Sequence, residues 1–217
     1  MNAAIQKTME NLSRNGITAR YAENDAEAMA ILKEYLQPGD TVAVGGSVTL
    51  DELGVLSLLR SGAYQFLDRY QPGLSADEVR GIFLKSFSAD VYLCSSNAVT
   101  EDGELYNVDG NANRVSAISF GPKSVVMIVG VNKIVPTLKD AILRVKTVAA
   151  PRNAKRLGLS TYCAKAGRCM SVDQHCGEEM AKGCHADNRI CCQYLVSAKQ
   201  RVNGRIKVII VNRELGY

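Results

Sequence analysis

Short apolar runs typical of buried strands alternate with amphipathic segments along most of this chain. The runs are "ITARYA", "TVAVGG", "YQFLDRY", "VYLCSS", "KSVVMIVG" and "RIKVIIVNREL". Helical patterns separate them, such as "AEAMAILKEYL" and a long amphipathic stretch from about Pro136 to Lys155. Strands that alternate with helices pair in parallel, because each crossover returns the chain to the same edge of the sheet. The pattern therefore predicts an α/β fold with a mostly parallel sheet and helices on both faces.

Length and composition are consistent with one domain over residues 1–217. Hydrophobic residues make up 47% of the chain and charged residues 22%, which is enough apolar material for a buried core. The net charge of +4 comes from charges scattered along the chain, so we expect no nucleic-acid partner. The N-terminus lacks the apolar run of a signal peptide, and no segment approaches the ~20 apolar residues of a membrane span. We therefore expect a cytoplasmic protein.

Six of the seven cysteines lie between Cys163 and Cys192. The segment 157–202 is rich in Cys, Gly and charge, so we interpret it as an excursion before the final strand of a single sheet. A reducing compartment disfavours disulfides in such a cluster.

Four of these residues could hold zinc or an iron-sulfur cluster. They are Cys163, Cys169, Cys184 and Cys191, with five, fourteen and six residues between successive cysteines. These spacings are looser than those of common zinc sites, so a redox-active dithiol pair and inert buried cysteines stay open as alternatives.

The stretch "VGGSVTLDELG" is the first candidate for a ligand site. A strand runs through Gly45 and Gly46 into a helix that begins near Ser47 or Thr49. Glycines let a ligand approach the backbone, and free amides with nearby hydroxyls suit an anion. The alternative is an ordinary strand-to-helix turn in which Ser47 or Thr49 caps the helix. A P-loop is excluded because its GK[ST] ending is absent.

The second candidate is "TEDGELYNVDGNANR", residues 100–114, which follows a predicted strand. Glu101 could act as a nucleophile or a general base, and Arg114 could bind a carboxylate or a phosphate. Further polar side chains that we expect around the same crevice are Asn97, Thr100, Asn107 and Asn113. A solvated hairpin with tight turns at its two Asp-Gly pairs is the alternative.

The third candidate is "VGVNKIV", which ends an apolar strand with Gly130, Asn132 and Lys133. A lysine at the carboxyl end of a strand can offset the charge of a bound anion. A solvated lysine after a strand is the more ordinary interpretation.

Taken with "SSNAVTEDGELYNVDGNANRVSAISFGPKSVVMIVGVNKIV", "CAKAGRC", "CHADNRIC" and "IKVIIVNRELGY", these motifs make the chain resemble the LUD family, the lactate utilization proteins of the C type. The resemblance covers most of the chain. It implies a fold of the sugar-phosphate isomerase and CoA-transferase type, a Rossmann-like three-layer sandwich. It also implies an association with the bacterial oxidation of L-lactate to pyruvate.

In related folds the crevice at the strand ends takes an anionic small molecule. By position, the turn from Gly45 to Ser47 would seat the anion, and the other candidates would line the crevice. The cysteine pattern departs from that of the family, in which a much shorter spacer separates the two pairs.

Three functions follow from these observations. The first is a protein of lactate oxidation that binds a carboxylate, a phosphate ester or a CoA thioester, and that contacts partner subunits through its Cys-rich segment. The second is a self-sufficient acyl-CoA transferase or sugar-phosphate isomerase that uses Glu101. The third is a non-catalytic module with the Cys-rich segment as a docking element. Oligomer formation stays open in all three.

Overall fold

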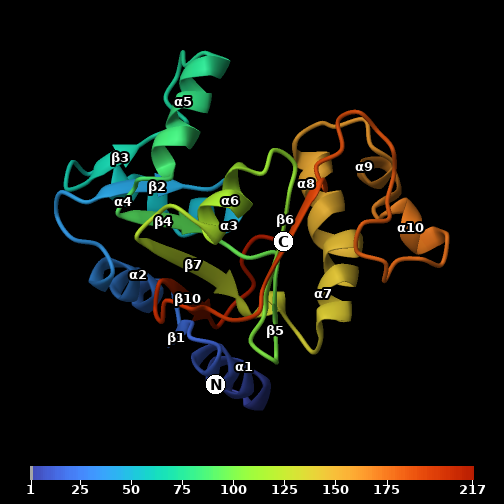
Figure 1. Ribbon diagram of the computed structural model, residues 1–217, viewed down its shortest axis with the longest axis horizontal. Coiled ribbons are helices and arrows are strands. Elements are labelled where there is room, and N and C mark those ends of the chain that lie inside the picture. Colours follow the sequence, from blue (N-terminus) through green and yellow to red (C-terminus); the bar gives the residue numbers. More distant parts are fainter. Residues whose placement is uncertain (1) are drawn as a thin grey trace.

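A computed structural model describes residues 2–217 of the protein. Six parallel strands form its main sheet (Figure 1). Every neighbouring pair in this sheet is parallel. The final strand of the chain lies inside the sheet, between the first and the seventh. In spatial order the strands are β1 (Thr18–Ala22), β10 (Ile206–Val211), β7 (Ser124–Gly130), β4 (Val91–Cys94), β2 (Thr41–Val44) and β3 (Gln65–Leu67). The predicted parallel α/β sheet is thus confirmed.

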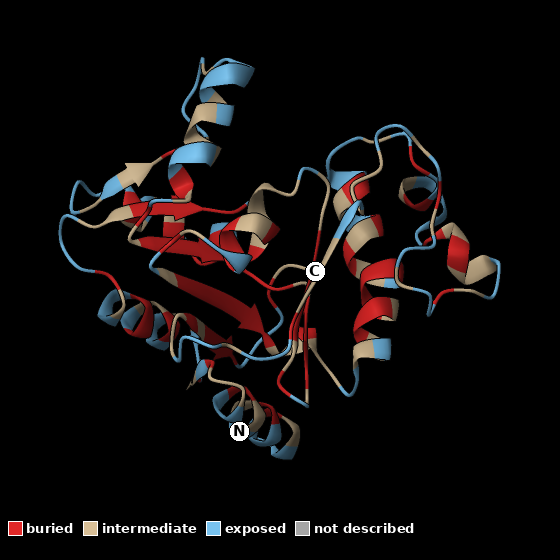
Figure 2. Cartoon of the chain, in the orientation of Figure 1, coloured by how far each residue is buried: buried red, intermediate tan, exposed pale blue. Residues whose placement is uncertain are grey.

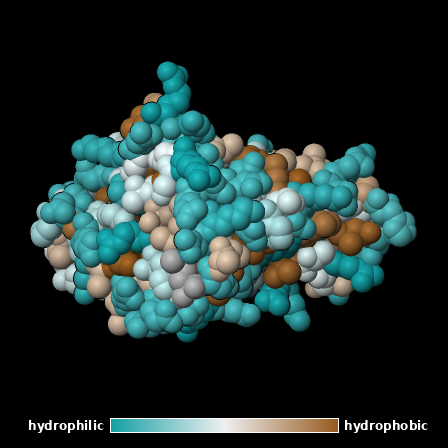
Figure 3. All heavy atoms as spheres, turned by 90° about the horizontal axis from the view of Figure 1, so that it is seen from below, coloured by the Kyte–Doolittle hydropathy of each residue, from teal (hydrophilic) through white to brown (hydrophobic). Residues whose placement is uncertain are grey.

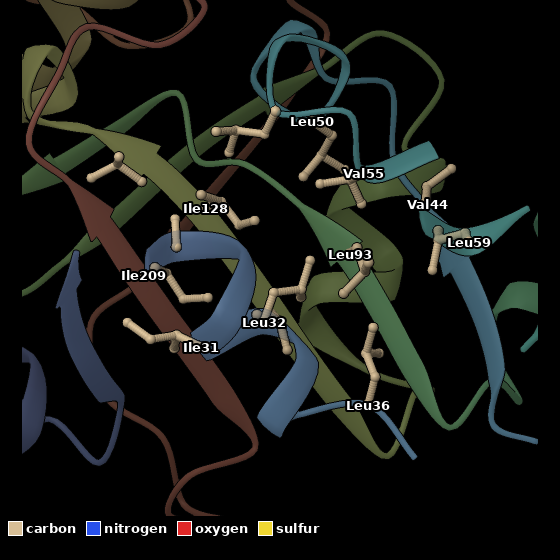
Figure 4. Close-up of a cluster of buried hydrophobic side chains, with 14 of the residues drawn as sticks. Ile31, Leu32, Leu36, Val44, Leu50, Val55, Leu59, Leu93, Ile128 and Ile209 are labelled. Carbon is tan, nitrogen blue, oxygen red and sulfur yellow. The ribbon is translucent and has the colours of Figure 1, made fainter. Parts of the chain in front are cut away.

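Helices cover both faces of the main sheet and give a three-layer arrangement. Successive strand residues point to opposite faces, so Val126 and Ile128 of β7 join one core while Val125 and Met127 join the other. The first core is closed by α2 (Asp25–Glu34), α3 (Val48–Glu52) and α4 (Val55–Leu59). Figure 4 shows Ile31 and Leu32 of α2 packed over the strands that carry Ile209, Ile128 and Leu93.

The second face is covered by α1 (Ala3–Arg14) and α6 (Asn113–Ser119). A further helix, α5 (Ala76–Ser86), projects from the edge of the sheet formed by β2 and β3, and most of its residues are exposed (Figure 2). Hydrophilic residues cover most of the surface seen from below, with apolar residues in scattered patches, as on an ordinary water-exposed surface (Figure 3). Within residues 2–217, no helix has the length and apolar character that crossing a membrane requires.

The protein has a second sheet of four strands, so the prediction of a single sheet is wrong. Its order is β8 (Ile134–Val135), β5 (Ala98–Thr100), β6 (Leu105–Asp109) and β9 (Gln193–Ser197). Strand β9 lies in the Cys-rich segment, so that segment contributes to a sheet rather than only looping out. The rest of the segment holds two short helices, α9 (Tyr162–Ala166) and α10 (Met170–Asp173).

The long helical stretch predicted after Pro136 packs on this second sheet. It consists of α7 (Leu138–Arg144), a π-helical segment η2 (Val145–Ala149) and α8 (Ala150–Arg156). Side chains from α7 and η2 share a third apolar core with Tyr106 and Val108 of β6. The second sheet and its helix thus form a smaller packing unit beside the main sheet (Figure 1).

The Asp102-Gly103 turn joins β5 to β6 and lies against α1. Asn15 Nδ2 donates hydrogen bonds to the carbonyl oxygens of Asp102 and Gly103, at 3.0 and 3.1 Å. Gly103 has a φ of +80°, and a Cβ at this position would lie 2.5 Å from the Asn11 carbonyl carbon and 2.6 Å from the Leu12 nitrogen. Only glycine fits, because the obstructing atoms belong to the backbone of a helix.

Replacing this glycine tests the contact between the turn and α1. We expect Gly103→Ala to lower the free energy of unfolding by ~1–3 kcal/mol more than Gly39→Ala does. The control shares the left-handed φ, at +87°, but its Cβ would meet nothing within 4 Å. Urea denaturation of both variants gives the comparison, and equal losses would show that the close approach to α1 is unimportant.

Candidate functional site

Loops that follow five strands of the main sheet line one cavity of about 430 Å³. In a parallel sheet the carboxyl ends of all strands meet at one edge, which is where such folds bind ligands. Representatives of the five loops are Ser47 after β2, Arg69 after β3, Ser95 after β4, Lys133 after β7 and Gly216 after β10.

The opposite wall of the cavity comes from the smaller packing unit. Val145 and Ala149 of η2 and Asn153 and Arg156 of α8 line it, together with the end of β6 and residues 187–191 of the Cys-rich segment. The cavity therefore lies between the two units, and neither unit encloses it alone.

Lys133 is the most deeply buried cation of the cavity, with 3% of its surface exposed. Its Nζ donates hydrogen bonds to Thr49 Oγ1 at 3.0 Å and to Ser95 Oγ at 2.9 Å. Burial, followed by the charges of Arg144 and Arg114, lowers the pKa of Lys133 to about 7. Near neutral pH the amine therefore exists in both protonation states, which suits proton transfer or nucleophilic attack.

Arg114 presents a second positive charge, in a fixed position. Its guanidinium donates to Asn107 Oδ1 at 2.6 Å, to Asn97 Oδ1 at 2.9 Å and to the Val108 carbonyl at 2.7 Å. A longer bond of 3.3 Å reaches the Ser95 carbonyl. These acceptors hold the side chain, so it supplies charge to the cavity wall rather than moving to grasp a ligand.

Arg69 carries an N–H group that no residue satisfies. Its buried Nε has no hydrogen-bond partner among residues 2–217. The guanidinium lies over the Phe83 ring, 4.7 Å from its centroid, and 5.1 Å from the centroid of Tyr70. The Nε is closed off from the cavity, so a ligand that reaches Arg69 would meet the outer nitrogens of this cavity-lining guanidinium.

The structure brings together most of the candidates from the strand ends. Those that line the cavity are Gly46, Ser47, Thr49, Asn97, Asn113, Arg114, Lys133 and Cys191. The capping interpretation of the first turn also describes what is seen, because Ser47 Oγ accepts a hydrogen bond from the Leu50 N–H at 3.3 Å.

Glu101 does not reach the cavity, although we expected it to act there. Its carboxylate pairs with Lys7 Nζ on α1 at 3.0 Å, and Asn11 donates to its carbonyl oxygen. Thr100 is fully buried and bonds to Glu104 in the same turn. Thr100 ends β5 and Glu101 follows it, and this strand belongs to the second sheet and carries both residues toward α1. The geometry thus gives no support to Glu101 as a nucleophile or a base.

Four other candidates do not line the cavity but contact residues that do, or contact the backbone next to them. Asn107 is fully buried under the Arg114 guanidinium, and Asn132 Oδ1 accepts from the Leu215 N–H at 3.1 Å. A Cβ at Gly130 would lie 2.5 Å from the Leu215 nitrogen, and one at Gly45 would lie 3.0 Å from atoms of Tyr92 and Arg114. These residues shape the site without lining it.

The four candidate metal ligands differ in exposure. Cys163, Cys169 and Cys184 are buried, whereas Cys191 is half-buried and lines the cavity. Burial raises the pKa of the Cys163 and Cys191 thiols, which favours the thiol over the thiolate that binds metals.

No group of three or more His, Cys, Asp or Glu side chains within residues 2–217 is arranged to hold a metal ion. The side chains of Cys163, Cys169, Cys184 and Cys191 therefore do not form a preformed zinc or iron-sulfur site. Metal binding there stays a prediction, which elemental analysis of the purified protein can check.

Several cavity residues were absent from our sequence-based candidates: Arg69, Ser95, Asn153, Arg156, Arg189 and Tyr217. Arg69 and Ser95 lie inside the predicted strands "YQFLDRY" and "VYLCSS". The structure ends these strands earlier, at Leu67 and Cys94, which places both residues in the loops that follow. Asn153 and Arg156 lie on a helix, and only the packing of that helix turns them toward the cavity.

The parallel sheet, its helices on both faces and the polar cavity at its carboxyl edge define a three-layer α/β protein. The chain belongs to the LUD domain family, whose model matches residues 5–211. Among curated proteins, none matches this chain.

A similar solved structure supports the fold. A DUF162 family protein from Deinococcus radiodurans is 17% identical over 96% of each chain, with a TM-score of 0.52. Weaker similarity links 52% of the chain to eIF2B beta from Chaetomium thermophilum and to ribose 5-phosphate isomerase from Plasmodium falciparum, which are each 16% identical. These two have TM-scores of 0.36 and 0.35, and the match covers 43% and 52% of their chains.

The lowered pKa of Lys133 predicts a pH dependence of stability. In the unfolded chain a lysine titrates near pH ~10.4, so between about pH 7 and that value the unfolded state binds more protons than the folded state. The contribution of Lys133 to the free energy of unfolding therefore rises with pH across this window. Below about pH 7 both states are protonated and the dependence vanishes.

We expect Lys133→Met to remove this slope, which is at most ~1.4 kcal/mol per pH unit for one group. Urea denaturation between pH 6 and pH 10 measures it, with the exposed Lys165→Met as the matched control. Parallel curves for the wild type and Lys133→Met would show that the lysine titrates normally.

Proposed function

We propose that this chain binds a small carboxylate-bearing molecule in the cavity and takes part in organic-acid oxidation of the lactate-utilization type, from L-lactate to pyruvate. One observation carries the proposal: three cations face a single cavity without a carboxylate partner. None of the ion pairs found within residues 2–217 includes Arg69, Arg114 or Lys133. Five cationic side chains line the cavity against the two carboxylates of Asp109 and Asp187, and this excess of positive charge favours an anionic ligand.

The dimensions and lining of the cavity agree with a small polar ligand. Its volume of about 430 Å³ is at the lower end of the range for small-molecule sites. Hydroxyls of Ser47 and Thr49 and the amides of Asn97 and Asn113 lie beside the cations. Such groups can orient the hydroxyl or carbonyl oxygen that accompanies the carboxylate in lactate or pyruvate.

The proposal includes a cytoplasmic location, which the lack of a signal-peptide pattern supports, and partner subunits of a lactate-oxidising system, which the family supports. A self-sufficient transferase or isomerase based on Glu101 is disfavoured, because that carboxylate pairs with Lys7 outside the cavity. Binding without turnover, as in a non-catalytic module, is an outcome that the following experiment distinguishes.

Calorimetric titration of the full chain with L-lactate, pyruvate, inorganic phosphate and acetyl-CoA tests the proposal. We expect a small carboxylate to bind, and Arg69→Met to weaken it by about tenfold or more, because a hydrogen bond to a charged group contributes ~1.5–3 kcal/mol. The control is Arg201→Met, which removes an exposed arginine outside the cavity lining.

Failure of both L-lactate and pyruvate to bind would contradict the proposal, and binding of phosphate or acetyl-CoA alone would point to a different anion. Equal binding by Arg69→Met and Arg201→Met would place the anion elsewhere on the surface. Binding of L-lactate without any conversion when electron acceptors are supplied would favour the non-catalytic module.

A further inference from the structure

The hydrogen-bond partners of Lys133 differ from those of buried Lys146 and half-buried Lys207. Lys146 donates to the Glu179 carbonyl, and Lys207 donates to the Gly204 carbonyl as well as to a serine hydroxyl. A carbonyl can only accept, so these two lysines fasten one chain segment to another. Lys133 bonds only to the hydroxyls of Thr49 and Ser95, and a hydroxyl can donate as well as accept. In the structure both hydroxyls donate to carbonyl oxygens, Thr49 to Leu215 and Ser95 to Ser96, each at 3.4 Å. These contacts are long, and a hydroxyl that rotates away from its carbonyl can donate to a neutral amine.

The charges around Lys133 also favour the neutral amine. The guanidiniums of Arg144 and Arg114 act on it as like charges, and the Glu52 carboxylate opposes them with a smaller effect. No carboxylate forms an ion pair with Lys133 within residues 2–217, so its burial is not offset in the usual way. These contacts favour a neutral, nucleophilic amine at Lys133 over an ammonium group that stabilises the fold through an ion pair.

Ser95 brings the amine and a cation to the same place. Its hydroxyl accepts from Lys133 Nζ at 2.9 Å, while its carbonyl accepts from the Arg114 guanidinium at 3.3 Å. A ligand with a carboxylate directed at this cationic wall would therefore carry its next carbon close to the lysine amine. A carbonyl at that carbon is the group with which an amine reacts.

We propose that Lys133 is a nucleophile that forms an imine with a small 2-oxo acid bound in the cavity. This proposal rests on the proposed carboxylate site and names the chemical class of its ligand, in which a carboxylate and a carbonyl occupy adjacent carbons. Arg114 and Arg69 offset the carboxylate charge, and the hydroxyls of Thr49 and Ser95 lie within hydrogen-bond distance of the reacting nitrogen.

The step balances without an oxidant or a reductant. The lone pair of the neutral amine attacks the carbonyl carbon, and the carbonyl oxygen takes up a proton to give a carbinolamine. Both protons of the amine end on that oxygen, which leaves as water as the carbon-nitrogen double bond forms. The hydroxyls of Thr49 and Ser95 are placed to pass these protons from nitrogen to oxygen.

Reductive trapping tests the proposal on the unmodified chain. The protein is incubated with pyruvate at neutral pH, reduced with borohydride, digested and analysed by mass spectrometry. We expect a carboxyethyl group on Lys133, at least about tenfold in excess over any other lysine, because a far larger fraction of this amine is neutral at that pH. Pyruvate without borohydride should leave no stable adduct.

Two variants complete the experiment. Lys133→Arg keeps the charge and should lose the adduct, whereas Lys165→Met, which removes an exposed lysine, should keep it. L-lactate, which has a hydroxyl in place of the 2-oxo group and cannot form an imine, should reduce trapping by competing for the carboxylate site.

The outcomes separate this inference from the proposed function. Calorimetric binding of pyruvate without trapping at Lys133 would overturn the imine and leave the carboxylate site intact. Labelling spread evenly over exposed lysines would overturn the imine as well. Absence of any carboxylate binding would remove the proposed function itself.

Discussion

The parallel pairing of the six strands in the main sheet is the constraint from which the site follows. A parallel sheet must be covered on both faces, so its strands are apolar on both sides and offer little room for polar chemistry. That chemistry gathers where the strands end, and parallel pairing puts all of those ends at one edge. Five loops with no similarity of sequence are brought together for this reason alone.

Two arginines join the main sheet to the smaller unit. Arg114, at the start of α6, bonds to the loop after β4 and to β6 of the second sheet. Arg144, on α7, donates to the carbonyl oxygens of Asn97 and Asn132, which lie in the loops after β4 and β7. A guanidinium can satisfy several fixed acceptors at once, which a lysine cannot do with the same geometry. The relative position of the two cavity walls thus depends on polar contacts at the cavity itself.

Most of the main sheet could be predicted from sequence, because β2, β4, β7 and β10 combine strong β-propensity with clear helical neighbours. The second sheet could not, since β8 has only two residues and β9 lies among cysteines and charges. Its pairing depends on contacts between distant segments, such as that between β6 and β9, which no local pattern encodes.

The site residues likewise divide into those that a local sequence pattern predicts and those that depend on contacts between distant segments. The rule that function lies just after a strand selected Ser47, Thr49 and Lys133, and the structure places all three at the cavity. It misplaced Glu101, because β5 is a strand of the other sheet and its end points toward α1. A residue after a strand shares the common edge only when the strand itself belongs to the common sheet, and one sequence does not reveal that membership.

The π-helical segment between α7 and α8 determines which side chains of this helix face the cavity. Each residue advances an α-helix by ~100°, so the wider turn at Val145–Ala149 changes the angular phase of everything after it. Arg144 before the segment faces the loops of the main sheet, while Asn153 and Arg156 after it face the cavity. A regular α-helix of the same composition would present a different set of side chains to the ligand. The side chains that form the cavity wall on η2 and α8 thus depend on the rotation of the helix about its axis as well as on its sequence.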